Sequence, residues 1–421
     1  MTAHIAGGLR AIDLKDPDLY VAGVPHEAFA WLRANDPVYW NPEVDGAGFW
    51  AVTRHADVVT VSNDPETYSS AKANGGHRLF NENELAVTGK SDDGAIEASM
   101  ISMDPPEHLA YRRMVMGGFT PPRLRDMEAG IRRRAVNLIE AMIERRRRDA
   151  GPMDFVSAFS APYAIQTLAE LFGVSDADGD KLFEWSNAVV GEDDPELRAS
   201  PDYMMSCLGE LARYAMGLWV ERERAPGGDL ISMLVDGARN GTAMNVPRYI
   251  GTFILLVVAG NETTRNSISG GLIALTENPD QRASLIADAS LATHAAQEIV
   301  RFISPVLHMR RTATRDLVLG DKQIRAGDKV VVWYPAANRD PDVFPDPDRF
   351  DIARTARPGG AKHVGFGTGE HVCLGQRLAE LQLRVAFEEL FARLPDLRPV
   401  GPPRRLRSNF INGIKELPVT F

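Results

Sequence analysis

Hydrophobic residues in the first hundred positions form short stretches separated by turns. Pro37–Trp40 and Gly48–Thr53 alternate and are rich in aromatic and β-branched side chains, a pattern typical of half-buried strands. Residues 72–100 are polar and glycine-rich, with weak periodicity. Because a loop of this length in a compact domain is usually functional or mobile, we expect one or the other here.

From about residue 105 to residue 300 the pattern becomes helical. Pro105 and Pro106 suit the first turn of a helix, which has no use for the missing amide hydrogens. Asn245 is a good N-cap for a long helix to about Glu277, which Asn278–Pro279 would stop. Since residues 253–258 are apolar on every side, this helix should cross the protein interior.

Short strands return between residues 312 and 334, separated by turns that contain glycine. Leu374–Leu394 is predicted to be a final amphipathic helix. We find no repeat and no low-complexity linker. We therefore expect one domain over residues 1–421, mainly α, with a minor β region at about 30–70 and 312–335.

The 421 residues carry a formal net charge of −10, which argues against a nucleic-acid partner because such proteins present a basic face. The run Arg145–Arg148 could bind an acidic partner, although a solvated helix end is the simpler explanation.

The sequence indicates a cytoplasmic protein without a membrane anchor. Two cysteines, Cys207 and Cys373, are too few for a disulfide scaffold and favour a reducing compartment. The N-terminus lacks the layout of a signal peptide. The longest apolar run, residues 253–260, is far shorter than the roughly 20 residues of a membrane helix.

The strongest chemical signal is Phe366–Gly375 (FGTGEHVCLG). Glycines at 365, 367 and 369 suit tight turns and a close approach to a flat ligand. Cys373 precedes the predicted final helix, whose N-terminus would lower the thiol pKa and favour a thiolate. Backbone amides of such a loop can also donate to the sulfur and tune a bound metal. A small buried cysteine in a turn is the alternative, but six specified positions within ten residues favour a metal ligand.

This segment resembles the cysteine-ligand loop of the cytochrome P450 family, in its form FGxGxHxCxG, and other landmarks follow in order over nearly the whole chain. The resemblance implies the cytochrome P450 fold, with haem b between the long central helix and the cysteine loop with the final helix. Cys373 would hold the iron. Because a thiolate ligand favours O–O cleavage, the implied activity is that of a bacterial haem-thiolate monooxygenase.

Residues 259–264 (AGNETT) place glycine, acid and alcohol in the middle of the apolar helix. Glycine costs about 1 kcal/mol there, and a threonine hydroxyl competes with the hydrogen-bond ladder; such conflicts tend to mark function. A local opening of the ladder would leave room for dioxygen and water. The resemblance makes Thr263 the hydrogen-bond partner of dioxygen at the haem and Glu262, often Asp in relatives, part of the proton supply. A helix kink with a satisfied threonine is the structural alternative.

Two haem propionates need cationic or hydrogen-bonding partners when buried. His108 and Arg112 are four residues apart and share a helix face, and with Arg311 and His371 they match family positions. For each residue a surface salt bridge is the alternative. The resemblance adds Ala259, Phe366 and Gly375 as further haem contacts.

Glu298 and Arg301 lie one helical turn apart and match the family's buried Glu–Arg pair. Residues 338–340 (NRD) and 347–350 (PDRF) complete that match. We expect these residues to serve folding and not catalysis.

Four regions should line the substrate pocket if the family fold holds: residues 72–100, 255–259, 305–308 and 409–414. Their side chains are mostly apolar, which suits a hydrophobic ligand, although each could be plain core. The candidate contacts are Leu255, Val258, Ala259, Val306, Leu307, Phe410 and Ile411. His308 could contact a polar group of the substrate or lie near the haem edge.

Within the family, VAGNETTRNSISGG, LHMRRTATRD, KVVVWYPAANRDP and RSNFINGIK are most similar to bacterial terminal hydroxylases of alkanes, methyl-branched lipids or sterol side chains, and to monoterpenoid hydroxylases. The implied reaction inserts one oxygen atom from O2 into a C–H bond of a lipid, alkane, terpenoid or steroid.

Electrons should come from a ferredoxin and an NAD(P)H-dependent ferredoxin reductase, since the sequence contains no flavin or iron–sulfur domain. The ferredoxin would dock at a basic patch of Arg112, Arg113, Arg377 and Arg384. A peroxide-driven hydroxylase is one alternative, against which the Glu262–Thr263 pair counts. A non-catalytic haem-binding sensor is another, disfavoured because no signalling or DNA-binding domain is found.

Overall fold

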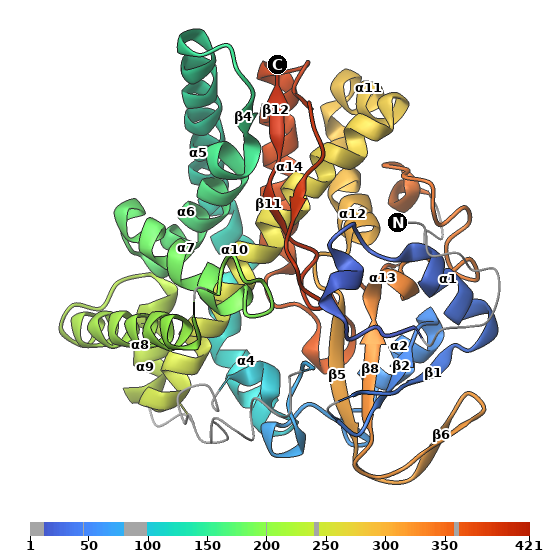
Figure 1. Ribbon diagram of the computed structural model, residues 1–421. Coiled ribbons are helices and arrows are strands. Elements are labelled where there is room, and N and C mark those ends of the chain that lie inside the picture. The colour runs from blue at the N-terminus through green and yellow to red at the C-terminus, as the bar shows by residue number, and fades with distance from the viewer. Residues whose placement is uncertain (1–11, 45, 80–98, 199, 240–243, 358–361) are drawn as a thin grey trace.

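The structure is a computed structural model that describes residues 12–44, 46–79, 99–198, 200–239, 244–357 and 362–421. Helices dominate, and a smaller β region lies to one side of them (Figure 1). The helices are α1 (His26–Asn35), α2 (His55–Asn63), α4 (Glu107–Met116), α5 (Pro121–Arg148), α6 (Ala161–Phe172), α7 (Asp176–Val190), α8 (Pro201–Arg224), α9 (Leu230–Arg239), α10 (Val246–Glu277), α11 (Pro279–Ala287), α12 (Ala292–Ile303), α13 (Tyr334–Ala337) and α14 (Gln376–Arg393).

The long helix α10 runs diagonally through the molecule and contacts α6, α7, α8, α12 and α14 (Figure 1). It begins where the sequence predicts, because the Asn245 side chain accepts a hydrogen bond from the Arg248 backbone amide at 3.1 Å. Most of its side chains are buried, which confirms the prediction of a helix through the protein interior.

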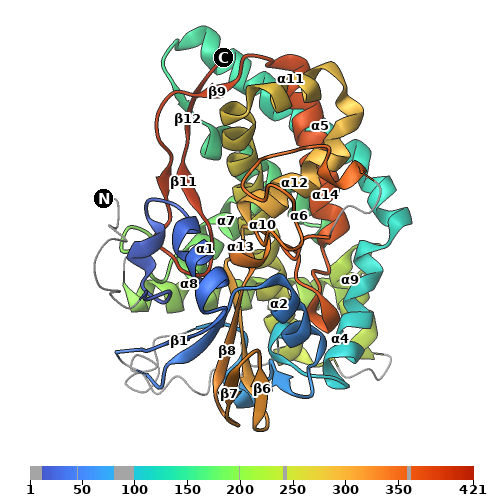
Figure 2. The same cartoon turned by 90° about the vertical axis from the view of Figure 1, so that its right-hand side faces the viewer.

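The largest sheet has the strand order β1-β2-β8-β5-β3. Strands β2 and β8 run parallel, and the other neighbouring pairs are antiparallel. In this order β8 is the central strand, and it is buried at every position. Figure 2 shows this sheet beside the helical part, with the β6–β7 hairpin at its end. The strands are β1 (Val38–Asn41), β2 (Phe49–Val52), β3 (Tyr68–Ser69), β4 (Met153–Asp154), β5 (His308–Ala313), β6 (Leu317–Leu319), β7 (Lys322–Ile324), β8 (Lys329–Trp333), β9 (Arg398–Pro399), β10 (Arg404–Arg405), β11 (Ile414–Glu416) and β12 (Pro418–Thr420).

Several predicted boundaries differ from the structure. The β region resumes at His308, four residues before the expected start, and the short strands β9 to β12 near the C-terminus were not predicted. Two- and three-residue strands carry too little alternation to stand out. Pro105 and Pro106 precede α4 and do not form its first turn, which begins at Glu107. Most of the predicted loop at 72–100 lies outside the described residues.

Among the residues that the structure describes, no helix combines the length and the hydropathy that crossing a membrane requires.

Candidate active site

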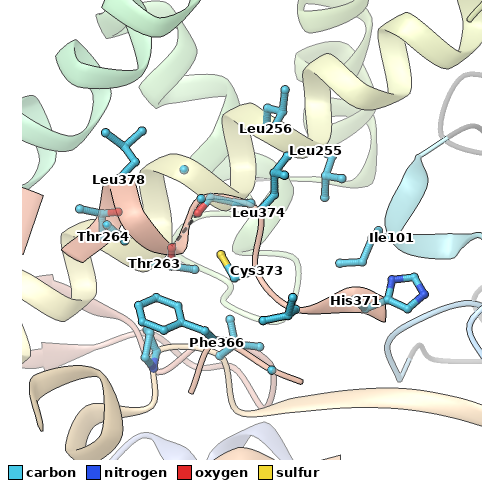
Figure 3. A pocket seen from close by; sticks show the side chains of 18 of the residues that line it. Ile101, Leu255, Leu256, Thr263, Thr264, Phe366, His371, Cys373, Leu374 and Leu378 are labelled. Carbon is cyan, nitrogen blue, oxygen red and sulfur yellow. Dashed lines mark hydrogen bonds between the residues drawn. The ribbon is translucent and has the colours of Figure 1, made fainter. Parts of the chain in front are cut away.

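An internal cavity lies between α10, α4, strand β5 and the loop that carries Cys373. Its volume, counted as the space open to the centres of water molecules, is about 230 Å³. Figure 3 shows Cys373 in the middle, with Thr263, Thr264 and Leu378 to one side of it and Ile101 and His371 to the other. The Cys373 loop and the centre of α10 therefore face the same space, as the sequence predicts.

Backbone geometry fixes the loop before Cys373. The Cys373 backbone amide donates to the Phe366 carbonyl oxygen at 2.8 Å. Gly367 and Gly369 both have φ of +72°, a left-handed conformation that favours glycine. A Cβ atom at Gly369 would lie 2.2 Å from the Ser62 carbonyl oxygen, so this glycine permits a close approach to protein backbone and not to a flat ligand.

The thiol of Cys373 is exposed, and since it lines the cavity, the surface it presents is internal. Burial raises the pKa of this thiol, while backbone amides of Gly375 and Gln376 and the charge of Arg112 lower it. Burial prevails and the pKa of the thiol is raised overall, although the amides of Gly375 and Gln376 at the start of α14 lower it, in the direction that the sequence predicts. The expected backbone donors to the sulfur are confirmed.

On α10, Thr263 lines the cavity and its hydroxyl donates to the Ala259 carbonyl oxygen at 2.7 Å (Figure 3). The helix continues through residues 259–264 without a break, so the expected opening of the ladder is not found. The Thr263 hydroxyl therefore has its hydrogen-bond partner within the helix, as in the structural alternative.

Glu262 lies outside the described lining of the cavity and is 1% exposed. It forms an ion pair with Arg265, one turn along the same helix. Burial raises the pKa of Glu262, and the charge of Arg265 and a hydrogen bond with Asn266 oppose that rise. The carboxyl is therefore a buried acid next to the cavity and not in its wall.

The four predicted propionate-binding residues, His108, Arg112, Arg311 and His371, all line the cavity. The His108 and His371 rings lie 4.1 Å apart, centroid to centroid. Burial lowers the pKa of His108 to about 4, and it lowers the pKa of His371 as well. Arg311 is 4% exposed and its guanidinium donates to the Arg310 carbonyl oxygen at 2.8 Å. Within the described part of the chain, neither Arg112 nor Arg311 has an acidic partner within ion-pair distance.

The Glu298–Arg301 pair is buried and is connected through Asn338 to the start of the cysteine loop. Arg301 donates to both Glu298 carboxylate oxygens at 2.7 Å and to the Asn338 carbonyl oxygen at 2.8 Å. The Asn338 side chain in turn accepts from the Val364 backbone amide at 2.8 Å, two residues before Phe366. The sequence did not indicate Arg354, whose guanidinium also pairs with Glu298 at 3.2 Å.

Three of the seven predicted substrate contacts line the cavity: Leu255, Ala259 and Val306. Leu307 does not, because consecutive residues of an extended chain point to opposite sides. Its side chain is fully buried in the core formed with Phe29 and Trp333. The structure therefore places Leu307 in this core and outside the described cavity lining, which does not favour the predicted contact with substrate.

Val258, Phe410 and Ile411 are also absent from the described lining. They pack together with Val190 in a small cluster that contains Val306, and Val306 pairs with Ile411 in an isolated bridge. The structure thus places these three residues next to Val306 and outside the described lining, and their contact with substrate stays a prediction.

Both ring nitrogens of His308 are occupied by backbone groups. Nδ1 donates to the Asn409 carbonyl oxygen at 2.9 Å, and Nε2 accepts from the Leu79 amide at 3.2 Å. Burial lowers the pKa of His308 to about 3, which keeps the ring neutral. Neither proposed role is found: His308 joins two chain segments and lies outside the described cavity lining.

Comparison with known proteins assigns the chain to a family. The cytochrome P450 family model matches residues 219–395. Linalool 8-monooxygenase of Pseudomonas putida is 49% identical over 97% of this chain and 98% of its own length. A Mycobacterium marinum cytochrome P450 in complex with pseudoionone has a TM-score of 0.87 at 35% identity, over 99% of this chain and 100% of that one. The chain belongs to the cytochrome P450 family. It is a monooxygenase, as its relatives are, and the cofactor of the family is haem iron.

Two other relatives are named for substrates of other classes, a steroid and a methyl-branched lipid. Steroid C26-monooxygenase of Rhodococcus jostii is 37% identical over 97% of this chain and 84% of its own length. The methyl-branched lipid omega-hydroxylase of Mycobacterium tuberculosis is 39% identical over 94% of this chain and 90% of its own length.

The residues around the cavity of this cytochrome P450 fit a haem. Arg311 is a buried cation, which requires an anionic partner, and a propionate carboxylate supplies one. Nδ1 of His108 and Nε2 of His371 are buried and have no hydrogen-bond partner among the described residues. The thiol of Cys373 faces the cavity from a loop whose amides donate to the sulfur.

The predicted basic patch is smaller than expected. Arg112 lines the cavity, and Arg384 pairs with Glu128 at 2.7 Å and with Glu388 at 3.0 Å. Arg113 and Arg377 are exposed. A surface charge paired with acids offers little to a partner, so only these two of the four predicted arginines stay available.

Sequence reasoning missed several cavity residues. Met309 lines the cavity with Arg311, its neighbour on the same face of β5, and the two-residue period of a strand could have indicated it. Leu168 and Leu171 come from α6, and no sequence signal shows which helix packs beside the centre of α10.

Proposed function

We propose that this cytochrome P450 binds haem b through the Cys373 thiolate and inserts one oxygen atom of O2 into a terminal C–H bond of a branched hydrophobic substrate. The observation that carries the proposal is the cavity in which Cys373 and Thr263 meet beside an apolar wall of Leu255, Val306 and Met309. We also propose that residues 1–421 form one domain that works in the cytoplasm.

The cavity residues divide into groups with different tasks. Cys373 would ligate the iron, while His108, Arg112, Arg311 and His371 would hold the propionates, because all four can donate hydrogen bonds and all four line the cavity. Ala259, Phe366 and Gly375 also line the cavity and would contact the macrocycle. When bound, haem supplies the activation of dioxygen that no amino-acid side chain provides.

Thr263 and Glu262 would deliver protons to the cavity. The Thr263 hydroxyl is in the cavity and, by rotating from the Ala259 carbonyl oxygen, can donate into it. Glu262 is its neighbour in sequence and has a raised pKa, which suits a carboxyl that takes up and releases protons. Its ion pair with Arg265 keeps it supplied with a hydrogen-bonding partner while it is charged.

The names of relatives support the substrate class. Linalool carbon 8, steroid carbon 26 and the omega carbon of a methyl-branched lipid each stand at the end of a branched chain. The described lining is apolar at Leu255, Val306 and Met309, and its two arginines, Arg112 and Arg311, are the residues proposed for the propionates. A terpenoid alcohol is the first candidate, since the linalool enzyme is 49% identical.

Electrons would come from a ferredoxin and its NAD(P)H-dependent reductase. The ferredoxin would approach the side of the cysteine loop, where Arg113 and Arg377 are exposed. An acidic partner is expected because opposite charges steer association.

The first test is a titration of the purified ferric haem protein, followed by the Soret band. Linalool, n-alkanes, branched fatty acids and sterones would be compared, with a charged molecule of similar size as control. We expect a shift toward the high-spin form with linalool at lower concentration than with n-alkanes. A shift with none of these classes, in a protein that holds haem, would contradict the proposed substrate.

A further inference from the structure

Helix α4 carries two of the residues that face the cavity, His108 and Arg112, four residues apart. The residues just before them, Glu107 and Tyr111, are also four apart and share a neighbouring face of the same helix. Anything that holds this second face fixes the rotation of α4 about its axis, and thereby the direction of His108 and Arg112.

Arg248 contacts both residues of that second face. One guanidinium nitrogen donates to the Tyr111 hydroxyl oxygen, and the other forms an ion pair with Glu107. The same guanidinium lies 4.9 Å from the centre of the Tyr111 ring. Tyr111 is fully buried, so its contact with Arg248 lies on the inner side of α4, while the Glu107 carboxylate, 48% exposed, closes the contact on the solvent side.

The place of Arg248 in the helix supports a dedicated role. It lies in the first turn of α10, where the helix macrodipole disfavours a cation. Its backbone amide is fixed by the Asn245 cap, so the side chain starts from a defined point. Its contacts with Glu107 and Tyr111 offset this unfavourable position and join the start of α10 to α4.

We propose that Arg248 is a positioning residue for haem retention: through Glu107 and Tyr111 it sets the rotation of α4 that directs His108 and Arg112 at the propionates. This inference rests on the propionate site proposed above. Arg248 itself is not placed in contact with the haem.

The test measures transfer of haem from the ferric holoprotein to an excess of apomyoglobin. We expect Arg248→Met, which keeps much of the apolar stem, to speed haem loss by roughly 2- to 10-fold, the range that corresponds to the net contribution of one ordinary hydrogen bond. Tyr111→Phe should give a smaller increase, and Arg248→Lys should restore part of the loss. Arg213→Met is the matched control, because Arg213 is a 71% exposed arginine that pairs with Glu210 on α8.

A double-mutant cycle with Arg112→Met separates positioning from general destabilisation. If Arg248 acts through α4, Arg248→Met adds less to haem loss once Arg112 is absent, because only His108 is then left to be misdirected. Full additivity of the two changes, or an unchanged rate in Arg248→Met, would overturn the inference. If Arg112→Met itself leaves haem loss unchanged, the propionate site fails instead, so the two failures are distinguishable.

Discussion

The Thr263 hydroxyl can serve either the hydrogen bonding of its own helix or the chemistry of the cavity. Its hydroxyl already has a partner, the Ala259 carbonyl oxygen, yet it faces the cavity. A residue with a satisfied hydroxyl in a helix needs no function to explain it, so the assignment depends on a measurement that folding alone would not affect.

Replacing Thr263 by alanine tests that assignment. We expect Thr263→Ala to bind substrate as the parent does, because the change removes only a small polar group from the wall. Electrons should instead be lost as hydrogen peroxide, with product per NADH falling by about tenfold or more. Measuring NADH, peroxide and product together checks this, with Thr263→Ser as the control that keeps the hydroxyl. Unchanged coupling in Thr263→Ala would remove this residue from the mechanism.

At the scale of elements, the cysteine loop depends on a network that begins in α12. Glu298 and Arg301 are almost fully buried, and Asn338 links them to Val364. The sequence pattern Glu-x-x-Arg predicts only a helical pair, which on most helices is solvated. What makes this pair important is its burial, and burial follows from packing that the pattern does not contain.

Glu298→Gln should therefore destabilise the protein strongly. The change leaves the buried charges of Arg301 and Arg354 without their carboxylate, and the expected loss in the free energy of unfolding is about 3–5 kcal/mol. Glu210→Gln provides the control, because its pair with Arg213 has the same i, i+3 spacing on an exposed surface and should cost at most about 1 kcal/mol. Denaturant unfolding of both variants gives the comparison. Equal losses would show that burial of the Glu298 pair has no special weight.

At the scale of the whole molecule, the sequence predicts those features that depend on neighbouring residues or on a short motif. The start of α10 follows from the Asn245 cap, and the meeting of Cys373 with Thr263 follows from motifs that family members share. The predictions that fail concern residues whose surroundings depend on how distant elements pack. Leu307 and Val306 are both apolar, and only the backbone direction before β5 decides which one faces the cavity. Likewise, Arg384 differs from Arg377 because α14 packs against α5, whose Glu128 neutralises it.

That difference leads to a prediction about the electron partner. Arg377→Glu should raise the KM for an acidic ferredoxin by roughly 3- to 10-fold, through repulsion at the docking surface. Turnover supported by peroxide needs no ferredoxin and should stay at the parent level. The effect should also shrink as salt is added. An unchanged KM at low salt would place the docking surface elsewhere.

The central claim is that the Cys373 thiolate holds the iron, and the reduced carbon-monoxide difference spectrum tests it most directly. The parent protein should give the red-shifted Soret band of thiolate-ligated haem, and Cys207→Ala should keep it, because Cys207 is buried in α8. Cys373→Ala should lose that band whether or not haem remains bound. A normal thiolate band in Cys373→Ala, or its loss in Cys207→Ala alone, would contradict the claim.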